Sequence, residues 1–332
     1  MAHYWFISTK YRRGAQLALV TCLLIFVVIV LGAYTRLTDA GLSCPDWPNC
    51  YGYLTAPHTE AQLQQAAQQY PGTPVDIKKA WTEMTHRYFA GFAGLFIIAL
   101  SLSILFARKA KDLKSILIAI SLLLLLGVQV TLGMLTVTEQ LKPMIVLSHL
   151  LTGLSILCLL WWIYLDLYMH DEGLITSAKT IRTPWLWLAF LIVTGQIILG
   201  GWVSTHYAGL ACIDFPYCNN QLLPTLKWHL WDSDLITIHM LHRIGALITA
   251  VYVGLLGISL LFNPSFRAIG ICILALLLIQ LTLGIANIIL LRPVWIALLH
   301  HAVAVLLLLT LLTALVKAYF ESREQRYGTW LT

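Results

Sequence analysis

Residues 31–50 read LGAYTRLTDAGLSCPDWPNC, and residues 199–218 read LGGWVSTHYAGLACIDFPYC. The two stretches align without gaps, and nine of the 20 aligned positions are identical, both cysteines among them. Chance does not easily give such a match across a stretch that leaves an apolar helix and enters a loop. The sequence therefore predicts a chain built from two related halves.

The match continues further along both halves. The matching segments are Thr85-His86-Arg87 with Leu241-His242-Arg243, residues 129–133 with residues 280–284, and His149 with His300. We expect two domains, residues 1–170 and residues 171–332, each with four helices and a long first outer loop. An even number of spans gives both halves the same orientation, so we expect a pseudo-two-fold axis along the membrane normal.

The composition is that of a membrane protein. Of the 332 residues 59% are hydrophobic and only 11% are charged, whereas soluble domains are about 25% charged. Eight apolar runs reach the roughly 20 residues that a membrane span needs: 15–35, 84–106, 115–137, 144–168, 185–205, 235–262, 268–291 and 294–318. We therefore expect an all-α integral membrane fold of eight transmembrane helices in two tandem four-helix bundles. The longest polar stretch, 36–81, is too short and too interrupted by proline for an obvious core of its own.

The distribution of Lys and Arg predicts the orientation. With the N-terminus inside, 13 of the 21 Lys and Arg residues fall in inner segments, as the positive-inside rule requires. Both termini are therefore expected to be cytoplasmic, and the first apolar run is interpreted as a spanning helix rather than a cleaved signal. This rule also accounts for the net charge of +6, so we infer no nucleic-acid partner.

Four of the seven cysteines form two C-x5-C pairs, Cys44/Cys50 and Cys212/Cys218. Both pairs fall in loops that the topology places outside, where an oxidising periplasm favours disulfides. A metal site is the other interpretation, although the spacing differs from the usual C-x2-C pattern of zinc sites. We expect one disulfide in each loop.

Six of the eleven histidines lie inside or at the ends of apolar helices: His86, His149, His239, His242, His300 and His301. Ionisable groups at membrane depth cost free energy, so each is a functional hypothesis. Four of them form matched pairs at similar depth in the membrane, His86 with His149 in the first half and His242 with His300 in the second. Facing helices of a four-helix bundle commonly hold a haem between such side chains. Hydrogen bonds between helices, or a zinc or copper ion, are the alternatives.

Arg87 and Arg243 each follow a candidate ligand. A guanidinium at this place is suited to pairing with haem propionates near the membrane surface. Snorkelling of the side chain to the interface is the alternative.

Glu83 marks a difference between the halves. It lies three residues before His86, on the same helix face, and the aligned residue of the second half is His239. A carboxyl group in an apolar pocket can act as a base or stabilise positive charge. The first half is therefore predicted to be the reacting site and the second a resident-cofactor site. The alternative is a glutamate in the first turn of a helix near the membrane surface.

These residues resemble the haem A synthase family in its bacterial, cysteine-containing form. The resemblance rests on the motifs TRLTDAGLSCPDWPNC (35–50), EMTHR (83–87), the TLG turns, His149, HMLHR (239–243) and LHH (299–301). It covers nearly the whole chain. It implies an oxidoreductase of the bacterial inner (cytoplasmic) membrane that converts the C8 methyl of haem O to a formyl group by successive hydroxylations, giving haem A for cytochrome oxidase.

The resemblance also implies roles for single residues. Haem O, the substrate, would lie in the first half with His86 and His149 as axial iron ligands, Arg87 beside it and Glu83 catalytic. A haem b cofactor would lie in the second half, and the residues implied for it are His242, His300, Arg243 and His239. The repeat favours His300 over its neighbour His301 as the ligand.

The expected partners are haem O and membrane lipid. The farnesyltransferase that makes haem O, oxidase assembly factors and a second copy of the chain are open candidates. Two other functions fit part of the pattern. A di-haem electron carrier explains the four histidines but not Glu83, and a haem transporter explains the repeat but needs a path open to both sides.

Overall fold

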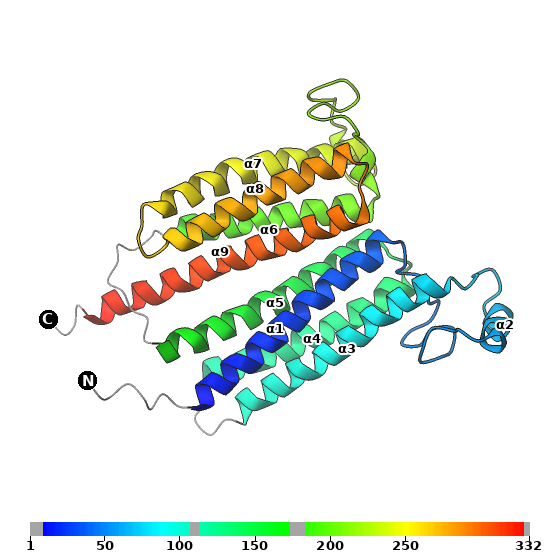
Figure 1. The fold of residues 1–332 in the computed structure, drawn as a ribbon, viewed down its shortest axis with the longest axis horizontal. Helices are drawn as coiled ribbons and strands as arrows, with labels where there is room; N and C mark the ends of the chain where they lie inside the picture. Colours follow the sequence, from blue (N-terminus) through cyan, green and yellow to red (C-terminus); the bar gives the residue numbers. More distant parts are fainter. Residues whose placement is uncertain (1–8, 107–112, 173–182, 329–332) are drawn as a thin grey trace. The chain divides into compact units, whose positions relative to one another are not determined.

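The computed structural model describes residues 9–106, 113–172 and 183–328. Within these ranges the fold is all-α, with nine α-helices, two short 3-10 helices and two isolated β-bridges. Eight of these helices are long and apolar enough to cross a membrane (Figure 1). The predicted class, an all-α membrane protein with eight spans, is confirmed.

The eight spanning helices alternate with short turns and two long loops. Their bounds are α1 Thr9–Leu37, α3 Ile77–Leu105, α4 Leu113–Thr138, α5 Pro143–Glu172, α6 Thr183–Thr205, α7 Leu235–Leu261, α8 Arg267–Ile289 and α9 Val294–Gly328. The first long loop carries α2 (Glu60–Gln69), and the second carries the 3-10 helices η1 (Ala208–Leu210) and η2 (Trp228–Leu230).

The described residues divide into two compact units, one of Gln16–Leu160 and one of the chain from Trp161 onward together with the start of α1. In the first unit α3 packs along α4. Gly32 of α1 lies against α3, Gly133 of α4 lies against α5, and Gly153 of α5 lies beside α1. In the second unit α6 and α8 each pack against both α7 and α9. Each unit is therefore a ring of four helices. The domain boundary at residue 170 and the pseudo-two-fold axis stay predictions.

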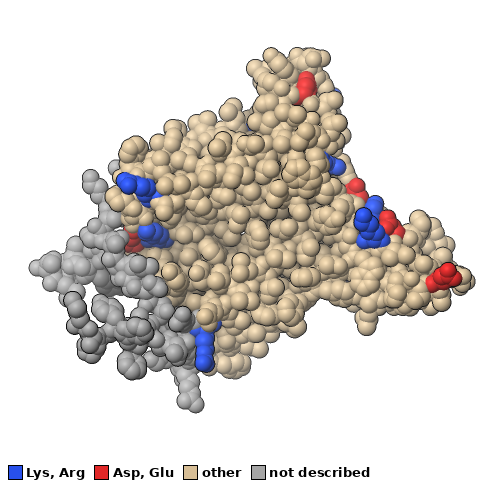
Figure 2. Space-filling model, viewed as in Figure 1, with Lys and Arg blue, Asp and Glu red and all other residues tan. Residues whose placement is uncertain are grey.

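Charge is confined to the ends of the spans on the face that Figure 2 shows, with an uncharged band between them. That distribution is the one a bilayer imposes, because an unpaired charge in hydrocarbon costs several kcal/mol. Of the basic residues counted as inner, five lie outside the described residues: Arg108, Lys109, Lys111, Lys179 and Arg182.

Helix α3 begins earlier than predicted, at Ile77 rather than at residue 84. Asp76 caps it by accepting a hydrogen bond from the backbone N–H of Lys79 at 3.0 Å. Asp234 caps α7 in the same way, at Thr237, with 2.9 Å. The apolar run marks only the part of a helix inside the bilayer, whereas an N-cap lets the helix extend into water.

The first outer loop packs against the first turns of α3. A small cluster is buried there, made of Cys44, Cys50, Tyr51, Ala56, Ala66, Ala80 and Met84. Helix α2 contributes Ala66 and begins with a capping box, in which Thr59 and Gln62 each bond the other's backbone N–H. The T-x-x-Q pattern at 59–62 was the available signal for this helix.

We expect Thr59→Ala to loosen α2. Loss of the capping hydroxyl removes about 1 kcal/mol, which is roughly fivefold faster hydrogen exchange of the α2 amides. Exchange measured by mass spectrometry on the detergent-solubilised protein tests this. Thr59→Ser keeps the hydroxyl and is the control, and equal protection in both variants would contradict the capping role.

Candidate functional site

The four candidate ligand histidines lie near the starts of α3, α5, α7 and α9. His86 and His149 belong to the first unit, and His242 and His300 belong to the second. The rings of His242 and His300 have centroids 6.5 Å apart and planes at 80°. Two imidazoles on opposite faces of one metal, each with a metal–nitrogen bond of about 2 Å, would have centroids about 6 Å apart. This pair therefore fits axial ligation of a haem iron.

A site for a bare metal ion has less support. Among the described residues, no group of three or more His, Cys, Asp or Glu side chains is placed to hold a metal. Each histidine pair offers two imidazoles, and a haem iron takes one or two axial ligands from a protein. It is His300, rather than His301, that faces His242.

A glycine of the adjacent helix lies against each of the four rings. The pairs are Gly32 with His86, Gly133 with His149, Gly200 with His242 and Gly284 with His300. A Cβ added to these glycines would lie 2.9, 3.2, 3.1 and 3.1 Å from the ring carbon Cε1, respectively. Normal carbon–carbon contacts are about 3.5–4.0 Å, so any side chain larger than glycine's would push the ring aside.

Glutamine side chains meet three of the four rings. Gln129 Nε2 lies 3.4 Å from His149 Nε2, Gln280 Nε2 lies 3.3 Å from His300 Nε2, and Gln196 Nε2 lies 3.1 Å from His242 Nδ1. The Oε1 atoms of all three are buried with no hydrogen-bond partner among the described residues. Each glutamine stands four residues before a ring-contacting glycine, in QVTLG, QIILG and QLTLG. That pattern was in the sequence, but we did not predict a role for it.

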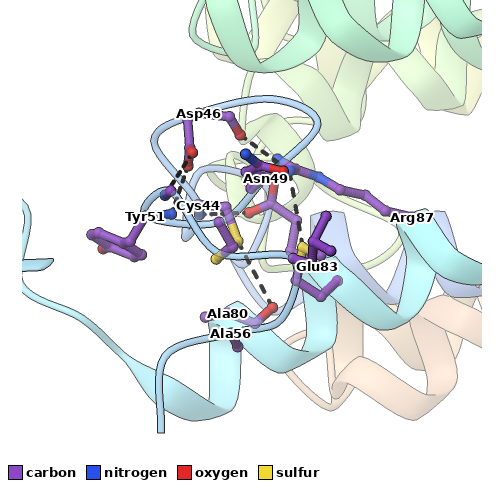
Figure 3. Close-up of a disulfide and its surroundings, with 12 residues drawn as sticks. Cys44, Asp46, Asn49, Tyr51, Ala56, Ala80, Glu83 and Arg87 are labelled. Carbon is purple, nitrogen blue, oxygen red and sulfur yellow. Dashed lines mark hydrogen bonds and ion pairs between the residues drawn. A yellow bond between two sulfur atoms is a disulfide. The ribbon is translucent and has the colours of Figure 1, made fainter. Parts of the chain in front are cut away.

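Glu83 is buried, with 3% of its surface exposed. Its Oε2 accepts a hydrogen bond from the backbone N–H of Cys44 at 2.9 Å, and its Oε1 pairs with Nη2 of Arg87 at 2.5 Å (Figure 3). The carboxylate is therefore not an exposed residue of a first turn. It ties the disulfide loop to the turn of α3 that carries His86.

Arg87 and Arg243 reach the disulfide loops instead of water. Nη1 of Arg87 donates to the carbonyls of Asp46, Pro48 and Asn49 at 3.1, 3.2 and 2.6 Å. The guanidinium of Arg243 donates to the carbonyls of Tyr217, Cys212 and Asp214 at 2.8, 2.9 and 3.2 Å. Both arginines thus hold loop backbone, a role that neither interpretation from the sequence foresaw.

His239 takes the place of Glu83 in the second half. The backbone N–H of Cys212 points at His239 Nδ1 at 3.3 Å, as that of Cys44 does at Glu83. His239 is 4% exposed. The two residues therefore share one structural task, but only Glu83 brings a carboxylate and an ion pair.

The two loops are built alike. Each contains a disulfide, Cys44–Cys50 in one and Cys212–Cys218 in the other. Asp46 accepts the N–H groups of Tyr51 and Gly52, and Asp214 accepts those of Asn219 and Asn220. The N–H groups of Asn220 and Asn219 hold the pKa of Asp214 below its usual value, because they stabilise the charged form.

Fold and site together define a multi-pass membrane protein with two histidine pairs, at least one of them spaced for a haem. Residues 15–312 match the model of the cytochrome oxidase assembly protein family, and the chain belongs to this family.

Similar proteins carry the name heme A synthase. The one from Shewanella oneidensis is 37% identical over 313 residues, which is 89% of this chain and 93% of that protein. The one from Neorickettsia sennetsu is 28% identical, covering 87% of this chain and 94% of that protein. The one from Nitrosospira multiformis is also 28% identical, covering 92% of each.

We expect Gly200→Ala to lower the haem content of the second half. The added methyl would displace the His242 ring, and misplaced ligand shells typically lower affinity about 10–100-fold. Haem per chain, measured by the pyridine haemochrome spectrum of the purified protein, tests this. Gly195→Ala, in the same helix, is the control, because a Cβ there meets nothing within 4 Å in the described part of the chain. Equal haem content in both variants would refute the contact.

Proposed function

We propose that this chain is a haem A synthase that oxidises the C8 methyl of haem O to a formyl group through hydroxylated intermediates. The observation that carries the proposal is the difference between two otherwise repeated sites. A buried carboxylate, paired with Arg87, lies one turn before His86, whereas His239 stands in that place in the second half. The names of the similar proteins support the same reaction.

The first half is assigned to the substrate. His86 and His149 are the proposed axial ligands of haem O, and Glu83 is the proposed catalytic residue. An ionised carboxylate has about four acceptor positions, and Glu83 accepts from the backbone N–H groups of Cys44 and Ser43 and from Arg87. It keeps the capacity to accept a proton from the reacting group, or to stabilise positive charge that develops on it.

Arg87 supports Glu83 in this scheme. Its guanidinium keeps a compensating positive charge beside the buried carboxylate, without which an isolated charge would be strongly disfavoured there. Because the same guanidinium binds three loop carbonyls, it also fixes the loop around the carboxylate.

The second half is assigned to a haem b cofactor between His242 and His300. Haem b bound there would supply one-electron transfer. His300 donates Nδ1–H to the backbone carbonyl of Gln280 at 3.2 Å, which leaves Nε2 as the ligand atom. Arg243 and His239 would contribute by holding the disulfide loop at the start of α7.

We further propose a bacterial inner membrane location with both termini in the cytoplasm. Each disulfide loop follows an odd-numbered span, so both loops lie on the side opposite the N-terminus. Disulfides persist in the oxidising periplasm rather than in the cytoplasm. Association with the farnesyltransferase that makes haem O, with oxidase assembly factors or with a second copy stays a prediction.

Extraction and chromatography of the bound haems test the function directly. The protein is purified from cells that also make haem O. We expect haem b together with haem O, haem A or hydroxylated intermediates. Two molecules of haem b per chain, and no other haem, would instead indicate the di-haem electron carrier.

We expect Glu83→Gln to abolish synthesis while sparing the loop. The amide can still accept the Cys44 N–H but cannot take up a proton, so haem A formation should fall at least about 100-fold with haem b retained. Glu83→Ala should also retain haem b and stop conversion, and should in addition free the loop. Glu139→Gln, which removes an exposed ion pair with Lys142, is the control. Normal haem A production by Glu83→Gln would remove Glu83 from the chemistry.

A further inference from the structure

The two repeated halves differ at the outer turn between their last two helices. Leu141 of the α4–α5 turn corresponds to Arg292 of the α8–α9 turn when the second histidines of the two pairs are aligned. The backbone supports this match. The N–H of Leu141 donates to the carbonyl of Thr136 at 2.8 Å, and the N–H of Arg292 donates to the carbonyl of Asn287 at 2.7 Å. An arginine therefore stands in the second half where the first half has a leucine.

Both side chains also lie in the same place relative to the disulfide loops. A Cβ added to Gly41 would lie 3.4 Å from Cδ2 of Leu141, and a Cβ added to Gly209 would lie 3.5 Å from Cδ of Arg292. Gly41 and Gly209 are aligned glycines of the repeated segments. Each side chain therefore lies between the helix turn and the loop, at the outer end of its own unit.

The guanidinium of Arg292 is without a protein partner. It belongs to a partly buried residue and forms no hydrogen bond or ion pair with the described residues. Arg87 and Arg243, which the sequence suggested for haem propionates, instead hold carbonyls of the disulfide loops. The five N–H donors of Arg292 are therefore available to a group from outside the chain.

Two buried polar atoms near the same turn also lack partners. They are Oδ1 of Asn287, near the end of α8, and Nε2 of His301, in the second turn of α9, and neither has a hydrogen-bond partner in the described ranges. The aligned residues of the first half are Thr136, whose hydroxyl bonds a carbonyl of its own helix at 2.7 Å, and Leu150. Buried polar atoms are normally paired. The second half therefore has capacity for a polar ligand at this place.

A haem in the second unit would bring a suitable ligand to this turn. A guanidinium pairs best with a carboxylate or a phosphate, through two parallel hydrogen bonds. Val294, the first residue of α9, lies six residues before His300, which is about 9 Å towards the outer surface. The outer edge of a haem bound at His300 would face this turn. Its propionates belong at that edge, because a charge costs more towards the middle of the bilayer.

We propose that Arg292 binds a propionate of the haem in the second half, and that Asn287 and His301 complete the polar pocket around it. This inference rests on the proposed function, in which that haem is the haem b cofactor. The ion pair attaches the cofactor at a second point, in addition to its axial histidines. A phospholipid headgroup in the outer leaflet offers similar anionic oxygens, so the experiment has to distinguish the two sources.

Two variants test the proposal. Arg292→Leu installs the residue of the first half, and Arg292→Lys keeps the charge without the planar guanidinium. The proteins are purified in a neutral detergent from cells that make haem O, and are mixed with excess apomyoglobin. Chromatography follows the rate at which each haem leaves, and a redox titration gives the midpoint potential of haem b. The phospholipid that remains bound to each protein is measured in the same samples.

In Arg292→Leu we expect haem b to leave at least about tenfold faster, because a hydrogen bond between charged groups is lost. Its midpoint potential should become more negative, because an uncompensated propionate near the iron favours the ferric state. Haem O or haem A should leave at the wild-type rate, since Leu141 occupies this place in the first half. Arg292→Lys should restore most of the potential, which a purely structural role of the arginine would not predict.

Arg267→Leu is the matched control. It removes the same charge from the other end of α8, where Arg267 is exposed and donates to the carbonyl of Leu261 at 3.1 Å. Both release rates and the potential should stay at their wild-type values. If Arg292→Leu does not fold, Arg292→Gln, which keeps a polar side chain but no charge, takes its place.

The outcomes separate the inference from the function. Haem b that leaves Arg292→Leu at the wild-type rate and keeps the wild-type potential would overturn the inference alone. Loss of bound phospholipid from Arg292→Leu, with haem b unaffected, would overturn it as well and assign the arginine to a lipid headgroup. Wild-type protein with two molecules of haem b and no other haem would overturn the proposed function. Faster loss of one of those two from Arg292→Leu would still support the role of the arginine.

Discussion

The contact between each candidate ligand ring and a glycine of the adjacent helix sets the geometry of both histidine pairs. Packed helix axes are usually about 8–10 Å apart, with side chains filling the space between them. A ring fits there only where the facing residue has no side chain, and each of the four rings meets a glycine. The ring is then held between two helices. Its position depends on the packing of the bundle and not on its own rotamer preference alone.

The disulfide loops are attached to the same turns of helix that carry the ligands. In α3 and α7 the residue three positions before the histidine binds the N–H of the first loop cysteine, and the arginine after it binds loop carbonyls. Loop and ligand therefore share one rigid segment. A change in the loop, such as reduction of its disulfide, would act directly on the helix turn beside the site.

Only a few residues beside the histidines distinguish the two repeated halves. Glu83 stands where the second half has the neutral ring of His239, and the loop contact is kept. Glu83 accepts the N–H of Cys44, and His239 accepts the N–H of the equivalent cysteine, Cys212. Gln196 with Gly245 replaces two apolar side chains beside a ligand ring. In the proposed function, the first exchange supplies the reacting group.

The sequence by itself determined the class, the eight spans, the repeat and the pairing of His242 with His300. Apolar runs report burial in lipid directly, and a repeated motif needs no coordinates to be seen. The tertiary structure decided what the polar residues contact. It placed Arg87 and Arg243 on loop carbonyls, joined Glu83 to the Cys44 amide, and brought Gln196 to His242 across 46 positions of chain. Such contacts depend on which helices pack together and in what register, and no local pattern of residues encodes that.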